Sequence, residues 1–250
     1  MEFLPEGLSL WSIVALMFSC LIGSAITTGV GMGGGILVIG MMSLFLPITA
    51  LLPVHALTQA SAGLIRAFMF RKSVLVRFFI FFILGSFVGY AIATQFLILL
   101  PQSTLKLFLG LGIIIMVFLP TFEIESISDK TVLLLGIVTG FLTMFVGVMG
   151  PIVGAFLSAF VKERHMIVGT IAWCLSFQNM GKALIFGQLG FDFAPWFLLI
   201  VLLVFVSYMG VLVGKKVLDK SNNALFKKVL KVVCVLLGGK LIFDALSLIS

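Results

Sequence analysis

Charged side chains are scarce in this sequence. Asp, Glu, Lys and Arg together make up 10% of its 250 residues, whereas a soluble globular domain has about a quarter. Hydrophobic residues account for 62% of the chain, which excludes a soluble domain and indicates an integral membrane protein. The apolar runs are long and continuous, so we expect helical spans instead of the short alternating strands of a membrane barrel.

Cysteine and histidine are also scarce. Cys20, Cys174 and Cys234 lie far apart inside apolar segments, so a disulfide framework and a cysteine metal site are both excluded. The only histidines in the sequence are His55 and His165. With so few nucleophiles and metal ligands we expect no catalytic residue, no metal and no cofactor. An intramembrane enzyme or redox protein is therefore the least favoured class.

Acidic side chains are nearly confined to the ends and the loops of the chain. Apart from Asp192 and Asp244, the apolar segments offer no carboxylate for a proton or sodium site of the usual kind. If the chain is a transporter, the simplest mechanism is therefore uniport, in which no second ion is coupled to the substrate. The first nine residues contain no Lys or Arg, which a signal peptide would need, so we expect the first apolar segment to be retained.

Glycine, in contrast, is concentrated in a run over residues 29–35, between two apolar segments. Glycine weakens a helix and leaves backbone N–H and C=O groups for which lipid offers no partner. Broken backbone at membrane depth persists where it is buried in protein or lines a watery cavity. Close packing of helices through small residues is the alternative explanation of a single run. A second copy over residues 147–151 favours paired helix breaks.

The chain repeats its plan after a shift of 116 residues. The pairs that coincide under this shift include Val30 with Val146, Gly31 with Gly147, Gly34 with Gly150, Ile36 with Ile152, and Arg66 with Lys182. Matches among apolar residues are common by chance, but a coincidence of two intramembrane cations is not. We expect five helical segments in each half, over about residues 9–27, 36–46, 55–70, 78–100 and 105–119, and then 132–146, 151–161, 166–186, 193–213 and 229–248.

Five crossings are an odd number, so the second half has the opposite orientation to the first. The sequence therefore predicts an all-α polytopic membrane protein with two inverted repeats, residues 1–122 and 129–250, and glycine-rich helix breaks near the midplane. Paired broken segments at matching positions of inverted halves are typical of a secondary transporter with its site between the halves. A channel or a structural protein has less reason for two such breaks.

The formal net charge of +7 bears first on orientation. In a soluble protein it would suggest a nucleic-acid partner, which we do not expect here. If all ten segments cross the membrane, nearly every basic loop lies on one side, which is the cytoplasm by the positive-inside rule, with Lys106 the exception. The basic residues of these loops are Arg71, Lys72, Arg77, Lys162, Arg164 and those within 215–231.

Each break is followed by a helix with a polar stripe. His55, Gln59 and Arg66 lie near one face of the first helix, and Gln178 and Lys182 near one face of the second. Amides and cations are costly in a membrane interior, so such groups indicate a function. Two cations together with free N–H groups at the breaks favour a small oxyanion, such as a carboxylate, a sulfonate or sulfite. The alternative is that both cations extend toward the membrane surfaces.

The predicted substrate-binding residues combine the breaks with the two stripes: Gly33, Gly34, Gly35, Thr58, Gln59, Ser61, Arg66, Met149, Gly150, Pro151, Gln178, Asn179 and Lys182. His55 is a candidate proton relay, although an interfacial histidine with satisfied hydrogen bonds is the more common case. Cys174 lies in the second stripe, where a buried inert thiol is the favoured interpretation. Lys240 and Asp244 are four residues apart and predict a structural ion pair.

The motifs resemble those of one known family. Gly31-Met-Gly-Gly-Gly-Ile-Leu-Val, followed by His55-Ala-Leu-Thr-Gln-Ala-Ser and the basic turn Arg71-Lys72, looks like the first half of TauE/SafE-type sulfite and organosulfonate permeases. Gly147-Val-Met-Gly-Pro-Ile-Val resembles the second glycine motif of that family. The similarity covers essentially the whole chain. It implies a multi-pass transporter of the bacterial inner membrane whose substrates include sulfite, sulfoacetate or related sulfur anions.

We therefore expect an exporter of a small sulfur-containing anion that works by alternating access around a midplane site. The alternatives are an anion channel, an uptake permease for small carboxylates or other anions, and an assembly or sensing subunit that would tolerate Arg66→Gln together with Lys182→Gln. The expected partners are the small anion and the lipid bilayer, and a homodimer is a further option.

Overall fold

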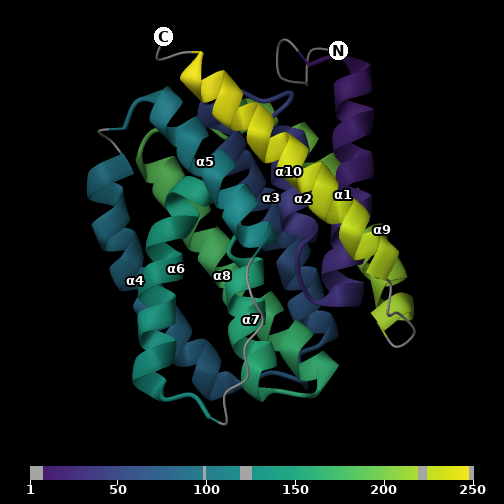
Figure 1. Ribbon diagram of the computed structural model, residues 1–250, viewed down its shortest axis with the longest axis vertical. Coiled ribbons are helices and arrows are strands. Elements are labelled where there is room, and N and C mark those ends of the chain that lie inside the picture. The colour runs from purple at the N-terminus through teal and green to yellow at the C-terminus, as the bar shows by residue number, and fades with distance from the viewer. Residues whose placement is uncertain (1–7, 98–99, 119–125, 219–223, 248–250) are drawn as a thin grey trace.

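The chain folds into a bundle of helices. A computed structural model describes residues 8–97, 100–118, 126–218 and 224–247 (Figure 1). The described residues form α1 (Leu10–Val30), α2 (Gly34–Met42), α3 (Ile48–Met69), α4 (Val76–Leu97), α5 (Gln102–Val117), α6 (Asp129–Val146), α7 (Gly150–Phe160), α8 (Arg164–Gln188), the 3-10 turn η1 (Ala194–Trp196), α9 (Phe197–Leu218) and α10 (Ala224–Leu246). No strand occurs in these ranges, and the all-α prediction is confirmed.

The ten helices correspond to the ten predicted segments, with one clear difference in extent. α3 begins at Ile48, so the prediction of a start near residue 55 was wrong. Pro53 lies inside the helix, close to its N-terminus. A proline at this position removes one hydrogen bond and bends the helix, but the chain can still continue through it.

α2 and α7 are too short to cross a membrane alone. α2 has 9 residues and α7 has 11, which correspond to lengths of about 14 and 17 Å at 1.5 Å per residue. The hydrocarbon core of a bilayer is about 30 Å thick. The condition that all ten segments cross therefore fails for these two helices. The count of five crossings in each half, from which the opposite orientation of the halves was predicted, was wrong for this reason.

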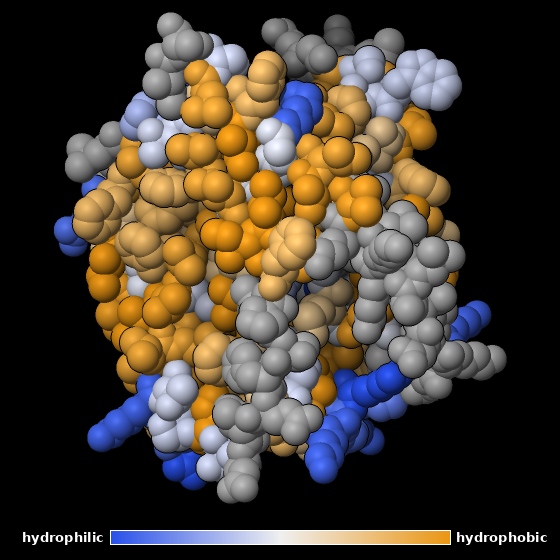
Figure 2. Space-filling view, viewed as in Figure 1, coloured by the Kyte–Doolittle hydropathy of each residue, from blue (hydrophilic) through white to orange (hydrophobic). Residues whose placement is uncertain are grey.

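Other helices suit a bilayer in length and in surface. Five stretches are long and apolar enough to cross, namely α1, α3, α4, α6 and the stretch from η1 into α9. Large apolar side chains on the outer face of α4, such as Leu84, Phe87 and Phe96, are exposed. The face in Figure 2 is hydrophobic across its middle, and hydrophilic side chains gather at its lower rim. This surface is suited to lipid, and the prediction of a multi-pass membrane protein is confirmed.

The helices pack in pairs (Figure 1). α4 lies beside α6 on the left of the view and α1 beside α9 on the right, while α3 packs on α8 and α5 on α10. Gly89 of α4 faces the carbonyl of Ile137 in α6 so closely that a Cβ at this position would overlap it, and Gly85 faces Leu133 in the same way. Small residues thus let the two backbones approach each other, as is common between membrane helices.

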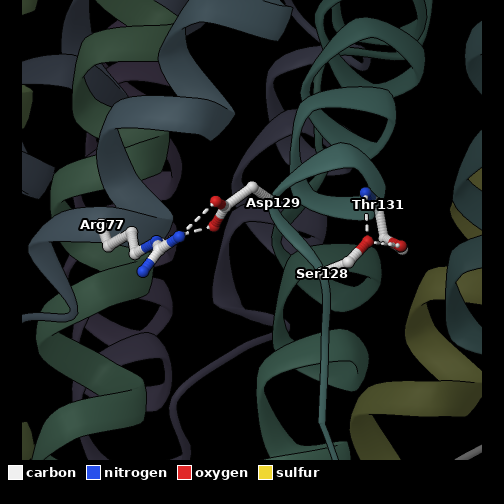
Figure 3. Close-up of polar contacts among 4 residues, drawn as sticks. All are labelled: Arg77, Ser128, Asp129 and Thr131. Carbon is white, nitrogen blue, oxygen red and sulfur yellow. Dashed lines mark hydrogen bonds and ion pairs between the residues drawn. The ribbon is translucent and has the colours of Figure 1, made fainter.

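An ion pair joins the first turns of α4 and α6 (Figure 3). Arg77 donates from Nε to Oδ1 of Asp129 at 2.9 Å and from Nη2 to Oδ2 at 2.6 Å. The neighbouring Ser128 caps α6, because its Oγ accepts from the N–H of Thr131 at 3.2 Å. The Arg77 side chain is 80% exposed, so this pair orients the two helix ends but contributes little to stability.

α3 and α8 run antiparallel through the bundle. The turn after α3 meets the start of α8, where the N–H of Leu75 donates to Oγ1 of Thr170 at 3.0 Å. Nearly two turns before the end of α3, a Cβ on Gly63 would overlap the Ser176 hydroxyl. The two contacts fix the register of the helices that carry the polar stripes.

Candidate functional site

Both glycine runs interrupt the helices. α1 ends at Val30, and Gly31 and Gly33 follow with φ angles of 92° and 96°. α6 ends at Val146, and Gly147 has a φ of 82°. These left-handed conformations favour glycine, because a Cβ would be strained there. The predicted breaks are therefore present at both positions.

Each break leaves the N-terminus of a short helix uncapped. α2 starts after Gly33 and α7 after Met149, and neither N-terminus receives a side-chain hydrogen bond. The first N–H groups of a helix have no partner within the helix, and they carry the positive end of its dipole. Two helix N-termini thus present unpaired donors close to the breaks.

The two breaks face a common cavity of about 40 Å³. It is lined by Thr27, Gly31, Met32, Gly33, Gly35, His55, Gln59, Arg66, Gly147, Val148, Met149, Gly150, Ile171, Leu175 and Asn179. One water needs about 10–15 Å³ of such volume, so the cavity holds about three waters or one small polyatomic ion. Segments far apart in the sequence, namely both breaks together with α3 and α8, therefore build one site.

Arg66 provides the positive charge of this cavity. The residue is 6% exposed and lines the cavity from the last turn of α3. No hydrogen bond and no ion pair within the described residues engages its guanidinium group. A buried cation without a counter-ion is costly. Since its side chain is buried, Arg66 does not extend to the membrane surface. The N–H donors of its guanidinium group are therefore free to bind a ligand.

Amide and imidazole groups add hydrogen-bonding capacity. A Cβ on Gly35 would lie 2.9 Å from Nε2 of Gln59, so the absent side chain leaves room for this amide. Asn179 donates from Nδ2 to the carbonyl of Leu175 at 2.9 Å, while its Oδ1 has no partner among the described residues. Both ring nitrogens of His55 are buried and also lack a partner there. The cavity therefore contains several groups that a small polar ligand can satisfy.

Eight of the residues singled out from the sequence meet at this cavity. They are Gly33, Gly35, His55, Gln59, Arg66, Met149, Gly150 and Asn179. Six others do not belong to its lining, namely Gly34, Thr58, Ser61, Pro151, Gln178 and Lys182. The candidate site is thus narrower than the sequence indicates.

Several of these six residues have structural contacts instead. Gly34 packs against α1, where a Cβ would overlap the carbonyl of Gly23. Gln178 donates from Nε2 to Oγ of Ser86 at 3.1 Å and to Oγ1 of Thr139 at 3.0 Å. Its amide therefore ties α8 to α4 and α6.

Lys182 lies beside the cavity, behind the second break. It is completely buried, and its Nζ has no hydrogen-bond partner within the described ranges. A Cβ on Gly147 would be 3.5 Å from Nζ, and the centroid of the Phe186 ring is 5.9 Å away. The His55 ring is near enough for a Coulombic interaction. The two predicted cations therefore occupy different places, Arg66 in the cavity wall and Lys182 outside it.

Seven lining residues were not among the predicted ones: Thr27, Gly31, Met32, Gly147, Val148, Ile171 and Leu175. The shift of 116 residues could have indicated two of them, because Ile171 corresponds to His55 and Leu175 to Gln59. Apolar residues at these positions carry no chemical signal of their own. They make the second half of the chain the less polar wall of the cavity.

Comparison with known proteins agrees with this architecture. The family model described as "Sulfite exporter TauE/SafE" matches residues 15–241, which is most of the chain. Neither the curated proteins nor the solved structures give a match. The match includes both glycine breaks, the helices with the polar stripes and every residue that lines the cavity. The chain therefore belongs to the TauE/SafE sulfite exporter family.

Proposed function

We propose that this protein exports a small sulfur-containing oxyanion, with sulfite as the favoured substrate, by alternating access at the cavity between the two breaks. The observation that carries the proposal is Arg66, a buried guanidinium group in the cavity wall without a partner among the described residues. Two uncapped helix N-termini beside it add partial positive charge and N–H donors. An oxyanion is the ligand that satisfies all of these groups together.

The cavity has room for an ion the size of sulfite, because its volume of about 40 Å³ corresponds to about three waters. Arg66 can bind two of the sulfite oxygens through parallel hydrogen bonds. The remaining oxygen is then free for the backbone N–H groups near Gly33 or Gly150.

The packing of corresponding elements supports the proposed inverted repeat. α3 and α8 coincide under the shift of 116 residues, and they pack antiparallel to each other. In five pairs that correspond under this shift, both residues line the cavity: Gly31 with Gly147, Met32 with Val148, Gly33 with Met149, His55 with Ile171, and Gln59 with Leu175. A site on a pseudo-twofold axis in the membrane plane would have this composition, and such sites serve alternating access.

The substitution Arg66→Gln tests the proposal. We expect sulfite efflux from proteoliposomes to fall at least tenfold, because the neutral amide removes the charge and the two-pronged donor from the cavity. Arg77→Gln is the matched control, since Arg77 is an exposed arginine of the neighbouring helix that pairs with Asp129. If the two variants transport sulfite at the same rate, Arg66 does not bind the substrate.

The main rival function is an anion channel with the same cation in its wall. A carrier that alternates between two states saturates with substrate and shows counterflow, in which unlabelled sulfite on one side drives labelled sulfite against its gradient. A channel shows neither property. Counterflow of radiolabelled sulfite in the wild-type protein therefore separates the two, and its absence together with single-channel currents would favour the channel.

A further inference from the structure

Lys182 is a buried cation that the cavity does not use. Its side chain is fully enclosed, and within the described residues Nζ has no hydrogen-bond partner and no ion pair. Phe186 offers at most a weak contact through its ring face at 5.9 Å. An ammonium group inside a membrane protein is costly unless it serves a function. Since no described residue pairs with Nζ, an external anion is the candidate partner of Lys182.

Arg66 and Lys182 lie at different levels of the bundle. Gly63 faces Ser176 where the antiparallel helices cross. Arg66 is three residues beyond Gly63 in α3, and Lys182 is six residues beyond Ser176 in α8, in the opposite direction. At 1.5 Å per residue the two cations are offset by about 13 Å along the helix axes. This offset is between their backbone positions, which lie on opposite sides of the crossing point, and only Arg66 lines the cavity in this conformation.

The two cations also correspond to each other in the repeat. Arg66 and Lys182 coincide under the shift of 116 residues, as do five pairs that line the cavity. In those five pairs both members face the cavity, whereas Arg66 faces it and Lys182 does not. Thr27, Gly35, Gly150 and Asn179 also line the cavity without their counterparts, and among these asymmetric positions Arg66 with Lys182 is the pair that carries charge.

We infer a second anion-binding position at Lys182, closed in this conformation, which the anion occupies after it leaves Arg66. The inference rests on the proposed function, because it takes the substrate of the Arg66 cavity as its ligand. When the two halves exchange their conformations, Lys182 takes the place in the cavity wall that Arg66 has here, and Arg66 becomes enclosed. One cation thus binds the anion when the site is open to one side of the membrane, and the other binds it when the site is open to the opposite side.

Gly147 is the element between the two positions. It lines the cavity, and its missing side chain brings the cavity wall close to Nζ of Lys182. A modest rearrangement of this break, whose glycine has a φ of 82°, suffices to open the path. The chemistry of the two cations differs, because Arg66 can hold an oxyanion with two parallel bonds, while Lys182 acts as a point charge. We therefore expect Arg66 to bind the anion more tightly than Lys182 does.

Binding and transport measurements separate the two positions. We expect Arg66→Gln to weaken binding of radiolabelled sulfite to the purified protein at least tenfold, and Lys182→Gln to change it less than threefold. Lys182→Gln should nevertheless lower sulfite counterflow at least tenfold. Lys182→Arg should restore part of the flux, whereas Lys240→Gln, which removes an exposed lysine paired with Asp244, should transport like the wild type. Elution of every variant as a single folded species is the control for misfolding.

Two results would overturn the inference. If Lys182→Gln weakens sulfite binding as much as Arg66→Gln does, both cations belong to one position. If Lys182→Gln transports sulfite at the wild-type rate, Lys182 has no place on the path. If sulfite is not the substrate, the wild-type protein neither binds nor transports it. That result is distinct from the two results above, which concern Lys182 alone.

Thiol labelling tests the same inference without any substrate. Arg66→Cys and Lys182→Cys are treated with a membrane-impermeant thiol reagent from one side of oriented proteoliposomes at a time. We expect the two cysteines to react from opposite sides. The wild-type protein provides the background, since Cys20, Cys174 and Cys234 are buried. Reaction of both introduced cysteines from the same side, or no reaction of Lys182→Cys from either side, would exclude a second position that opens in turn.

Discussion

At the scale of single residues, Gly35 shows how an absent side chain shapes the candidate site. It is the second residue of α2 and lies beside the Gln59 amide. We expect Gly35→Ala to weaken sulfite binding about tenfold, equivalent to roughly 1.4 kcal/mol, because the new Cβ displaces that amide from the cavity. The fold should persist, since the atom that must move ends a flexible side chain.

Gly239→Ala is the control for this substitution. Gly239 also lies within a helix, and a Cβ added there would meet nothing within 4 Å. Binding isotherms of radiolabelled sulfite for the two alanine variants give the comparison. Equal affinity in both would mean that Gln59 does not contact the anion.

Gln178 is a second residue whose role the tertiary structure clarifies. Its amide joins α8 to Ser86 of α4 and Thr139 of α6. Each of these hydroxyls also donates to a carbonyl of its own helix, so Gln178→Leu leaves neither without a partner. We expect a loss of about 0.6–1.7 kcal/mol of stability, typical of hydrogen bonds between membrane helices.

A thermal-unfolding scan of Gln178→Leu in detergent measures this loss as a lower Tm. Gln188→Leu is the matched control, because Gln188 is an exposed glutamine at the end of the same helix. A Tm equal to that of the control would show that the contacts of Gln178 with α4 and α6 do not stabilise the bundle.

At the scale of helices, close backbone approach holds the two outer pairs together. Gly89 of α4 faces the Ile137 carbonyl of α6, and Gly210 of α9 faces the Leu21 carbonyl of α1. Ile137 and Leu21 coincide under the shift of 116 residues, whereas Gly89 and Gly210 are 121 residues apart. The two interfaces thus use similar contacts, which the proposed inverted repeat would explain.

We expect Gly89→Ala and Gly210→Ala to destabilise the protein by similar amounts, about 1–3 kcal/mol each, because the added methyl group overlaps a backbone atom that cannot move alone. Gly187→Ala, whose Cβ would meet only Phe193 at 3.7 Å, is the control and should unfold like the wild type. Chemical unfolding of the three variants measures the difference. A strong effect at one glycine of the pair and none at the other would contradict the equivalence of the two interfaces.

At the scale of the whole molecule, the proposed uniport of an anion predicts that the direction of transport depends on the membrane potential. An inside-negative potential favours the exit of an uncoupled anion by about 2.3 kcal/mol per charge per 100 mV. We expect such a potential to accelerate sulfite efflux from proteoliposomes. At a clamped potential, a change of the external pH alone should leave the initial efflux rate unchanged, because the internal substrate is the same. Marked acceleration by external acid would indicate proton coupling and exclude uniport.

The distribution of charge agrees with the proposed orientation of the molecule. The exposed basic residues Arg71, Lys72, Arg77 and Lys162 belong to the turn after α3, the start of α4 and the turn after α7, which meet at one end of the bundle. Hydrophilic side chains gather at the same lower rim in Figure 2. By the positive-inside rule this end faces the cytoplasm. Arg66 lies in the last turn of α3, close to that end.

The sequence by itself determined the class of protein, the number of helices and the two breaks. Continuous apolar runs leave helices as the spanning structure, and glycine runs such as that around Gly31 and Gly33 interrupt a helix wherever they occur. It also singled out Arg66 and Lys182 as intramembrane cations, because charge is costly inside a membrane and therefore informative.

Only the tertiary structure decided which of the polar residues share a cavity. Gln178 and Gln59 look alike in sequence, yet one joins three helices and the other lines the cavity. Likewise, Arg66 and Lys182 coincide in the repeat, but the antiparallel register of α3 and α8 separates them along the bundle. The physical reason is that a helical stripe specifies the direction of a side chain around its own axis, whereas the level at which it meets another helix depends on packing between the two.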